Sequence, residues 1–209
     1  MDHSNTLYFP SLRKDAKQME KEIEIEFKNL LNQSEYKQLK DTFSPFHKNH
    51  ARQSNFYFET PTFQLKNAGA ALRVRKKDTK INATLKLPNP EGPGLLEIHV
   101  PITDGDLKSW MENDINLPQE LTDYLYSFQI NPTDLQFGGS LKTIRDEYAY
   151  RGMLLVLDHS FYHGLEDYEL ELETSDEQIG KQIFKEILEA NAIPIRKTPN
   201  KVARFYESL

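Results

Sequence analysis

Charged and hydrophobic residues alternate strictly along positions 22–28, close to the start of the chain. Successive side chains of a β-strand point to opposite faces, so such a segment presents one charged face and one apolar face. Three glutamates spaced about 6–7 Å apart on one face repel one another, and glutamate is a poor strand former. Either this face is the solvated side of a half-buried strand, or metal ions or basic side chains lie opposite it. The charged face consists of Glu22, Glu24, Glu26 and Lys28.

Eight segments have the composition of strands, and short turn sequences such as Asp78-Thr79-Lys80 and Arg151-Gly152 separate two pairs of them. Strands joined by tight turns pair as antiparallel neighbours, so the pattern predicts an antiparallel sheet or barrel. The predicted strands cover residues 20–30, 54–60, 71–77, 81–87, 95–102, 139–149, 153–160 and 167–174.

Capping residues and helical periodicity predict helices between and after these strands. Asn32 with Glu35, and Ser175 with Gln178, have the spacing of capping boxes, and an apolar stripe follows Ser175. The pair Thr198-Pro199 supplies an N-cap residue and a proline at the first position of a last helix. The helix after Asn32 is expected over 34–43, and two further helices are expected over 104–113 and 119–127.

The later strands also carry one charged face and one mostly apolar face. The helical stripes need a sheet surface to pack on, and if the helices cover the outside of the sheet, the charged faces must point inward. We therefore expect an inverted barrel, apolar outside and charged inside, whose charges pair with one another, with metal or with ligand. The inward-facing residues beyond the first strand would be Arg73, Arg75, Lys77, Thr84, Lys86, Glu97, His99, Lys142, Arg145, Glu147, Asp158, Glu169, Glu171 and Glu173.

Such a lumen combines two kinds of ligand-binding group. The carboxylates of the first and last strands, with Asp158, are hard oxygen ligands that suit Mg²⁺ or Mn²⁺. The arginines and lysines of the strands between them can form charge-assisted hydrogen bonds to phosphate oxygens. Together they suit a polyphosphate chain bridged by one or two divalent cations.

Length and composition limit the number of domains, the kinds of partner and the cellular location that we expect. The 209 residues suffice for one domain with a full core, which we assign to residues 19–209. Residues 1–18 show no periodicity and are expected to be a loose extension, which makes Met19 a candidate natural start. The formal net charge of −6 argues against a nucleic-acid binder. The chain has no cysteine, no signal-peptide pattern and no apolar run approaching about 18 residues, so we expect a cytoplasmic protein without a membrane partner.

The charged residues also match the pattern of a known family over roughly residues 20–209. The first strand carries Glu-x-Glu-x-Lys at Glu24, Glu26 and Lys28, and the last carries a Glu-x-Glu pair. With these motifs the chain resembles the CYTH domain, or triphosphate tunnel metalloenzyme, family, and most closely its small members from Gram-positive bacteria. Further matching positions are Arg73, Arg75, Thr84, Lys86, Glu97, Arg145 and Asp158.

The resemblance implies an α+β, mainly β fold, in which eight antiparallel strands close into a tunnel with a charged lumen and helices outside. It also implies metal-dependent action on triphosphate compounds. The family includes class IV adenylate cyclases, thiamine triphosphatases, RNA triphosphatases and inorganic tripolyphosphatases.

The charged lumen and the family resemblance together imply roles for individual residues. We expect Glu24, Glu26, Lys28 and Arg75 to be catalytic, although salt bridges within the lumen would be a purely structural alternative. Asp158 is either a ligand or a residue that orients a basic side chain. The expected phosphate contacts are Arg73, Arg75, Lys86, Arg145, Lys201 and Arg204. The expected metal ligands are Glu24, Glu26, Asp158, Glu169 and Glu171, with Glu171 and Glu173 as the other possible C-terminal pair.

Other residues of note have plainer interpretations. Lys77 and Lys142 are expected at the tunnel mouth or surface, and His99 is expected to be structural. The aromatic residues expected to be core or packing residues are Tyr57, Phe58, Trp110, Tyr148 and Tyr150.

The function that these observations predict is hydrolysis of triphosphate compounds with Mg²⁺ or Mn²⁺, most simply of inorganic tripolyphosphate by a monomer or homodimer. A lumen lined by charge needs only the phosphate chain of such a substrate. The alternatives are an adenylate cyclase, a thiamine triphosphatase, a non-catalytic polyphosphate- or nucleotide-binding module, and a barrel whose charges only pair internally.

Overall fold

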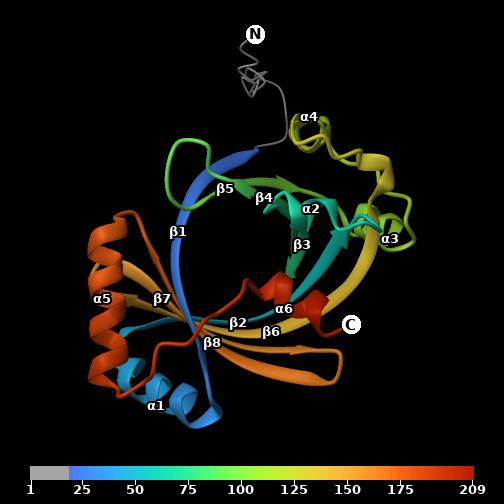
Figure 1. Cartoon of the computed structure of the whole chain (residues 1–209). Coiled ribbons are helices and arrows are strands. Elements are labelled where there is room, and N and C mark those ends of the chain that lie inside the picture. The colour runs from blue at the N-terminus through green and yellow to red at the C-terminus, as the bar shows by residue number, and fades with distance from the viewer. Residues whose placement is uncertain (1–18) are drawn as a thin grey trace.

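A closed barrel of eight antiparallel strands forms the body of the protein (Figure 1). The computed structural model describes residues 19–209, and the segment 1–18, expected to be a loose extension, lies outside the described residues. Around the barrel the strands follow the order β1-β5-β4-β3-β2-β6-β7-β8, which confirms the closed antiparallel tunnel. The strands are β1 (Glu20–Leu31), β2 (His47–Glu59), β3 (Ala71–Lys77), β4 (Lys80–Pro88), β5 (Leu95–Pro101), β6 (Gln136–Tyr150), β7 (Met153–Tyr162) and β8 (Leu165–Thr174).

Helices cover much of the outside of this barrel. Two of them, α1 and α5, pack on β1 and β8, while α3 and α4 lie over the opposite part of the wall (Figure 1). The helices are α1 (Gln33–Phe43), α2 (Gln64–Asn67), α3 (Asp104–Met111), α4 (Gln119–Ser127), α5 (Glu177–Ala190) and α6 (Lys201–Glu207). Within residues 19–209, no helix combines the length and apolar character that a membrane span requires.

The barrel is inverted, as the alternation of the strands predicts. On β3, Leu72 and Val74 point outward into the core beneath the helices, whereas Arg73 and Arg75 line the cavity inside the barrel. On β8, Leu170 and Leu172 are likewise covered by α1 and α5. Burial of these outward apolar residues stabilises the fold by roughly 1.5–3 kcal/mol for each fully buried large side chain. Because the outer face supplies this stabilisation, the inner face is free to carry charge.

Helix α6 is the exception among the helices, because it packs against the inner face of the barrel. Phe205 of α6 is fully buried against Tyr57 and Leu141, both on inward positions of β2 and β6. A side chain at Gly139 would meet the Phe205 ring at 2.8 Å, and one at Gly138 would overlap the Tyr206 hydroxyl oxygen. The two consecutive glycines of β6 therefore make room for α6 inside the ring of strands (Figure 1).

Several local predictions are confirmed in detail. The Asn32 side chain accepts a hydrogen bond from the Glu35 backbone nitrogen, and the Glu35 carboxylate accepts one from the Asn32 nitrogen, which completes the capping box. Strand β3 and helix α4 have the predicted bounds. Trp110 and Tyr148 are each 1% exposed, as expected for core residues.

Two predicted helix starts are wrong. Asp176, not Ser175, caps α5 by accepting a hydrogen bond from the Ile179 nitrogen. Helix α6 begins at Lys201 rather than at Pro199, because the Thr198 hydroxyl is engaged elsewhere, as acceptor from the Leu30 nitrogen of β1.

Strand β2 begins at His47, seven residues earlier than predicted, and α2 was not predicted at all. The early half of β2 is polar and carries little alternation, and it forms a strand because it pairs with residues 142–148 of β6. Pairing with a distant strand decides its conformation, which local composition does not reveal.

Candidate functional site

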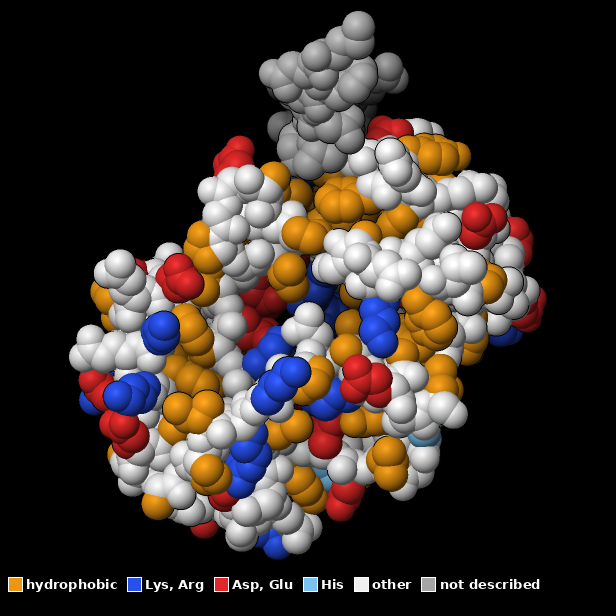
Figure 2. Space-filling view, viewed as in Figure 1, with side chains coloured by type: hydrophobic (Ala, Val, Ile, Leu, Met, Phe, Trp, Pro, Cys, Tyr) orange, Lys and Arg blue, Asp and Glu red, His pale blue; other side chains and the backbone are white. Residues whose placement is uncertain are grey.

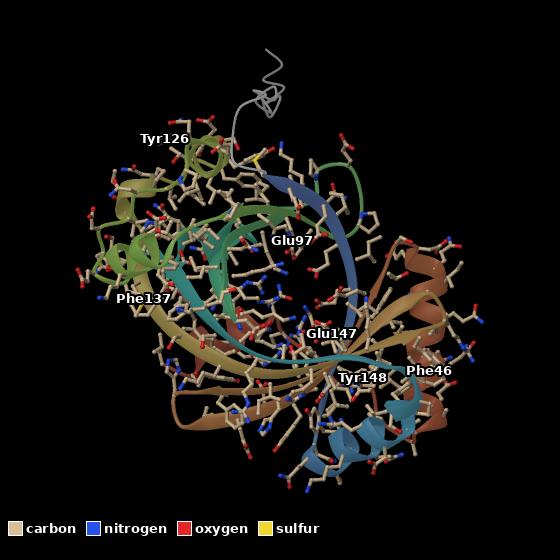
Figure 3. All side chains as sticks on the ribbon, turned by 180° about the vertical axis from the view of Figure 1, so that it is seen from behind. Phe46, Glu97, Tyr126, Phe137, Glu147 and Tyr148 are labelled. Atoms are coloured by element: carbon tan, nitrogen blue, oxygen red, sulfur yellow. The ribbon has the colours of Figure 1, made fainter. Side chains whose placement is uncertain are left out.

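The charged inner faces of the strands enclose one cavity of about 700 Å³. Basic and acidic side chains gather in the hollow that opens at the centre of the face in Figure 2. In Figure 3, Glu97 of β5 and Glu147 of β6 lie on the inside of the ring of strands, whereas Tyr148 lies on the side of α1. The charged lining residues are Glu22, Glu24, Glu26, Lys28, Glu59, Lys66, Arg73, Arg75, Lys86, Glu97, His99, Arg145, Glu147, Glu169, Glu171, Glu173 and Lys201.

One wall of the cavity is acidic and is built from β1 and β8. The antiparallel register places Glu26 directly opposite Glu173. Glu24 accepts a hydrogen bond from Lys86 at 2.8 Å and Glu26 accepts one from Lys28 at 2.9 Å. Glu173 has a weaker partner, since its nearest basic atom among the described residues is Arg145 Nη1 at 3.8 Å.

Burial disfavours the charged form of these three carboxylates. It raises the pKa of Glu173 to about 7, and the nearby charges of Glu24, Glu171 and Glu26 add to the effect although Arg145 opposes it. Burial also raises the pKa of Glu26, with a further contribution from Glu171. The pKa of Glu24 is raised for the same reason, together with its hydrogen bond to Glu97. Crowded carboxylates of this kind fit a divalent cation, which would neutralise their mutual repulsion.

A second wall is basic and is built from β3. Arg75 donates a hydrogen bond from Nε to Asn55 Oδ1 at 3.0 Å, and the buried Nε of Arg73 has no hydrogen-bond partner among the described residues. Within residues 19–209, no carboxylate lies within ion-pairing distance of either arginine, although both line the cavity. Burial and the charges of Arg73 and Arg145 lower the pKa of Arg75 to about 9. Two neighbouring guanidinium groups without acidic partners are suited to bind an anionic ligand.

Lys86 connects the acidic wall to β5. It forms ion pairs with Glu24 and Glu97, which approach it from β1 and β5. Burial opposes the ionisation of Glu97, but the hydrogen bond with Glu24 and the charges of Lys86 and Arg73 lower its pKa to about 2. Glu97 is therefore a fixed negative charge that holds Lys86 at the cavity wall.

Asp158 lies at the centre of a buried ion cluster behind the cavity. It is fully buried and accepts two hydrogen bonds from Arg145, at 2.8 and 2.7 Å, and one from Lys201. Arg145 also donates to Glu171 at 2.6 Å, and Lys201 donates to the same carboxylate at 3.1 Å. Asp158 is not among the cavity-lining residues, and basic groups occupy its oxygens. Its position therefore supports the orienting role rather than that of a metal ligand.

Glu169 lines the cavity, but basic side chains hold its carboxylate as they hold that of Asp158. Arg204 donates to it at 2.8 Å and to Asp167 at 2.9 Å, and Lys201 lies 3.1 Å from it. Arg204 is not among the cavity-lining residues, whereas Lys201 is. Both oxygens of Glu171 are bound as well, by Arg145 and Lys201, so Glu173 is the more open member of the two possible C-terminal pairs.

The remaining predicted charges occupy the ends of the barrel or its surface. Lys77 lies 3.8 Å from Glu147, and neither Lys77 nor Lys142 lines the cavity. Both ring nitrogens of His99 form hydrogen bonds, Nδ1 with Thr84 Oγ1 at 3.0 Å and Nε2 with Glu22 Oε1 at 2.9 Å.

The ligand atoms of Glu22, Glu97 and His99 all lie within 4.8 Å of one another, a grouping that could hold a metal ion. The sequence did not indicate this group, because its residues come from two strands whose register was not known.

Sequence reasoning also missed five polar or charged residues of the cavity lining, namely Gln53, Asn55, Glu59, Lys66 and Asn200. Asn55 is 1% exposed and lies opposite Arg75 across the β2–β3 pair. Asn200 accepts a hydrogen bond from Lys28 Nζ at 2.5 Å. Only the alternation of β2 gave a signal for Asn55, and nothing in the local sequence singled out Asn200.

The chain belongs to the CYTH domain family, whose model matches residues 22–206. The match covers every strand of the barrel apart from the first two residues of β1. This agrees with the motifs on β1, β3 and β8 and with the tunnel that they enclose.

Relatives with sequence similarity extend this assignment. The "Putative triphosphatase YjbK" of Bacillus subtilis is 41% identical over 191 residues, which cover 90% of this chain and 97% of that protein. A crystal structure of a "putative adenylate cyclase" from Bacillus halodurans is 38% identical, with a TM-score of 0.82, and the match covers 89% of this chain and 98% of that one.

The same fold occurs in a more distant plant protein. HpAC1 from Hippeastrum, described as a "putative adenylyl cyclase" with a dominant triphosphatase activity, is 24% identical, with a TM-score of 0.73. The match covers 88% of this chain and 96% of that one. At this identity the likeness shows the fold alone.

Proposed function

We propose that this protein hydrolyses triphosphate compounds with a divalent cation, Mg²⁺ or Mn²⁺, and that inorganic tripolyphosphate is its preferred substrate. The observation that carries the proposal is the arrangement of the cavity. Two arginines that have no acidic partner within residues 19–209 face the same cavity as three glutamates whose pKa values are raised. The name of the Bacillus subtilis relative supports triphosphate hydrolysis as the reaction class.

The carboxylates that would hold the cation are Glu24, Glu26 and Glu173. Glu24 and Glu26 share the inner face of β1, and Glu173 lies opposite Glu26. This choice leaves out Asp158, Glu169 and Glu171 of the sequence-based ligand set, because basic side chains already occupy the oxygens of all three. When bound, a divalent cation would neutralise phosphate charge and favour attack by water.

The basic side chains would bind and orient the phosphate chain. Arg73 and Arg75 offer free N–H groups to phosphate oxygens, and their positive charge would stabilise the charge that develops on the oxygens during P–O cleavage. Lys86 and Lys201 line the same space, each anchored by carboxylates. Water would attack the terminal phosphorus in line with the departing bridging oxygen, and the products would be inorganic phosphate and a diphosphate.

Tripolyphosphate is preferred because the cavity offers little aromatic surface for an organic group. Tyr57 and Phe58 line the cavity, but they are only 3% and 2% exposed. Tyr206 of α6 is the more open aromatic ring of the lining, so it is the side chain that a thiamine or nucleoside group would contact.

A substrate panel tests this proposal directly. We expect phosphate release from tripolyphosphate with Mg²⁺ or Mn²⁺, and slower release from thiamine triphosphate and ATP. No release from any of the three would overturn the hydrolase assignment, and metal-dependent binding without turnover would instead support a binding module.

A second candidate is adenylate cyclase, which the description of the Bacillus halodurans structure favours. In that reaction the ribose 3′-hydroxyl attacks the α-phosphorus, and the products from ATP are cyclic AMP and pyrophosphate. Product analysis separates the two, because a hydrolase would release ADP and phosphate instead.

A further inference from the structure

The contact between Lys28 of β1 and Asn200, the residue before α6, has features that a structural role does not explain. Lys28 Nζ donates to Glu26 Oε1 at 2.9 Å and to Asn200 Oδ1 at 2.5 Å, and all three residues line the cavity. An ammonium group has three N–H donors, so these two acceptors fix its position and leave one donor for a ligand.

Asn200 does not use its side chain as asparagines at helix starts usually do. Asparagine is favoured at this position because its side-chain oxygen accepts a hydrogen bond from the first turn of the helix. In this chain Asn32 accepts from the Glu35 nitrogen at 2.8 Å, and Asn131 accepts from the Thr133 nitrogen at 3.2 Å. Asn200 occupies the same position before α6 and makes no such bond. Its oxygen points to Lys28 instead of stabilising its own helix.

Asn200 also differs from Glu26 as a partner of Lys28. In the proposed function, the Glu26 carboxylate would also interact with a divalent cation. This interaction would weaken its hydrogen bond to the Lys28 ammonium group. The neutral amide of Asn200 is a poorer metal ligand and remains available. It would therefore keep Lys28 in place when the cavity is loaded.

We propose that Asn200 is a positioning residue, which holds the Lys28 ammonium group toward the terminal phosphate of the substrate and its attacking water. The inference rests on the proposed function for the role of Lys28. The contact joins the C-terminal segment to the Glu-x-Glu-x-Lys motif of β1, so correct placement of Lys28 depends on docking of α6.

The test compares Asn200→Ala with the conservative variant Asn200→Asp, which keeps an acceptor oxygen. We expect kcat for tripolyphosphate to fall about tenfold in Asn200→Ala, with KM changed less than about twofold, because Arg73 and Arg75 still bind the phosphates. That loss corresponds to removal of one hydrogen bond to a charged group. Asn200→Asp should recover most of kcat. The melting temperature should stay constant in both, since the Asn200 side chain does not cap α6.

Thr198→Ala is the matched control. It removes the 2.9 Å hydrogen bond from the Leu30 nitrogen to the same C-terminal segment without touching Lys28. An equal loss of kcat in Thr198→Ala, unchanged kcat in Asn200→Ala, or failure of Asn200→Asp to recover activity would each overturn the positioning role.

A second readout does not depend on activity. In metal-free protein, ¹⁵N NMR of the lysine side chains should show slow hydrogen exchange at the Lys28 ammonium group in the wild type and in Asn200→Asp. Exchange should become fast in Asn200→Ala. Equal exchange in all three would overturn the inference. Wild-type protein that hydrolyses no triphosphate would instead overturn the proposed function, and the exchange experiment would still decide whether Asn200 holds Lys28.

Discussion

Glu26 and Glu173 lie directly opposite one another on the antiparallel strands β1 and β8, with both carboxylates facing the cavity. Like charges at opposed positions of a strand pair destabilise a sheet. Lys28 partly compensates Glu26, whereas Glu173 has no basic atom closer than 3.8 Å among the described residues. Repulsion between Glu26 and Glu173 therefore destabilises the folded protein locally, and a bound cation would remove this repulsion.

Replacement of Glu173 by glutamine should stabilise the metal-free protein at high pH. The pKa of about 7 in the folded protein exceeds the ordinary value of 4.5, so folding favours the protonated form. The contribution of Glu173 to stability is therefore complete below about pH 4.5 and is lost as the pH rises through 7. Urea unfolding with EDTA should show Glu173→Gln up to about 3 kcal/mol more stable than wild type at pH 8 and equal to it at pH 4.5. A difference independent of pH would contradict this assignment.

Divalent cations should reverse the order of stability of wild type and Glu173→Gln. In the wild type, Mg²⁺ or Mn²⁺ should raise the melting temperature by several degrees above pH 7, since a ligand that binds only the folded state stabilises it. The rise should be smaller in Glu173→Gln and in Glu24→Gln, and removal of the metal with EDTA should abolish turnover. Equal melting shifts in all three proteins would show that the cation binds elsewhere, for example at Glu22, Glu97 and His99.

Truncation of an unpaired arginine should remove activity and leave the fold intact. Arg75→Ala should lower kcat/KM for tripolyphosphate by at least about a hundredfold, because one charge-assisted contact with phosphate contributes roughly 1.5–3 kcal/mol and this residue also faces the reacting group. Stability should stay the same or rise, since the guanidinium is buried without a carboxylate. Glu26→Ala should likewise lose turnover without unfolding.

Lys77→Ala is the control for Arg75→Ala, because Lys77 lies on the same strand but outside the cavity. Tripolyphosphate should raise the melting temperature of this variant as in the wild type, and it should fail to do so in Arg75→Ala. Unfolding of Arg75→Ala and Glu26→Ala would mean that the lumen charges are structural.

Replacement of Arg204, unlike that of Arg75, should lower the stability of the protein. It pairs with Asp167 and Glu169 in a buried position, so Arg204→Met leaves two carboxylates without their main partner. Loss of one partner from a buried ion pair costs roughly 3–5 kcal/mol, and we expect a loss of stability in this range by urea unfolding. Arg151→Ala is the control, because it breaks a fully exposed pair with Glu186 and should leave stability unchanged. A fall in activity with normal stability would instead assign Arg204 to phosphate binding.

The inward orientation of the charges was predictable because strand alternation is a local property. Glu24, Arg73 and Lys86 follow the period of two within their own strands, and the apolar stripes of the helices fixed which face they cover. The capping box of Asn32 and Glu35 was predictable for the same reason, since both partners lie within one turn. By contrast, the early half of β2 has no clear alternation and becomes a strand only through its pairing with β6.

The partners of the charged residues could not be predicted in this way. Glu169 and Glu171 were the expected C-terminal metal ligands, whereas the ion pairs of Lys201 and Arg204 leave Glu173 more open. Lys201 and Arg204 reach these carboxylates only because α6 packs inside the barrel against Gly138 and Gly139. That placement depends on contacts between residues 66 and 68 positions apart in the chain, Gly139 with Phe205 and Gly138 with Tyr206.

The amino-acid sequence by itself determined the strands, their inward charge and the family motifs, because these follow from side-chain order along single segments. Only the tertiary structure decided which carboxylates remain open to the cavity, that Arg73 and Arg75 have no acidic partner in the part of the chain that the structure describes, and that Asn200 contacts Lys28. Those facts depend on strand register, barrel closure and the docking of α6, which bring together atoms that the chain keeps far apart.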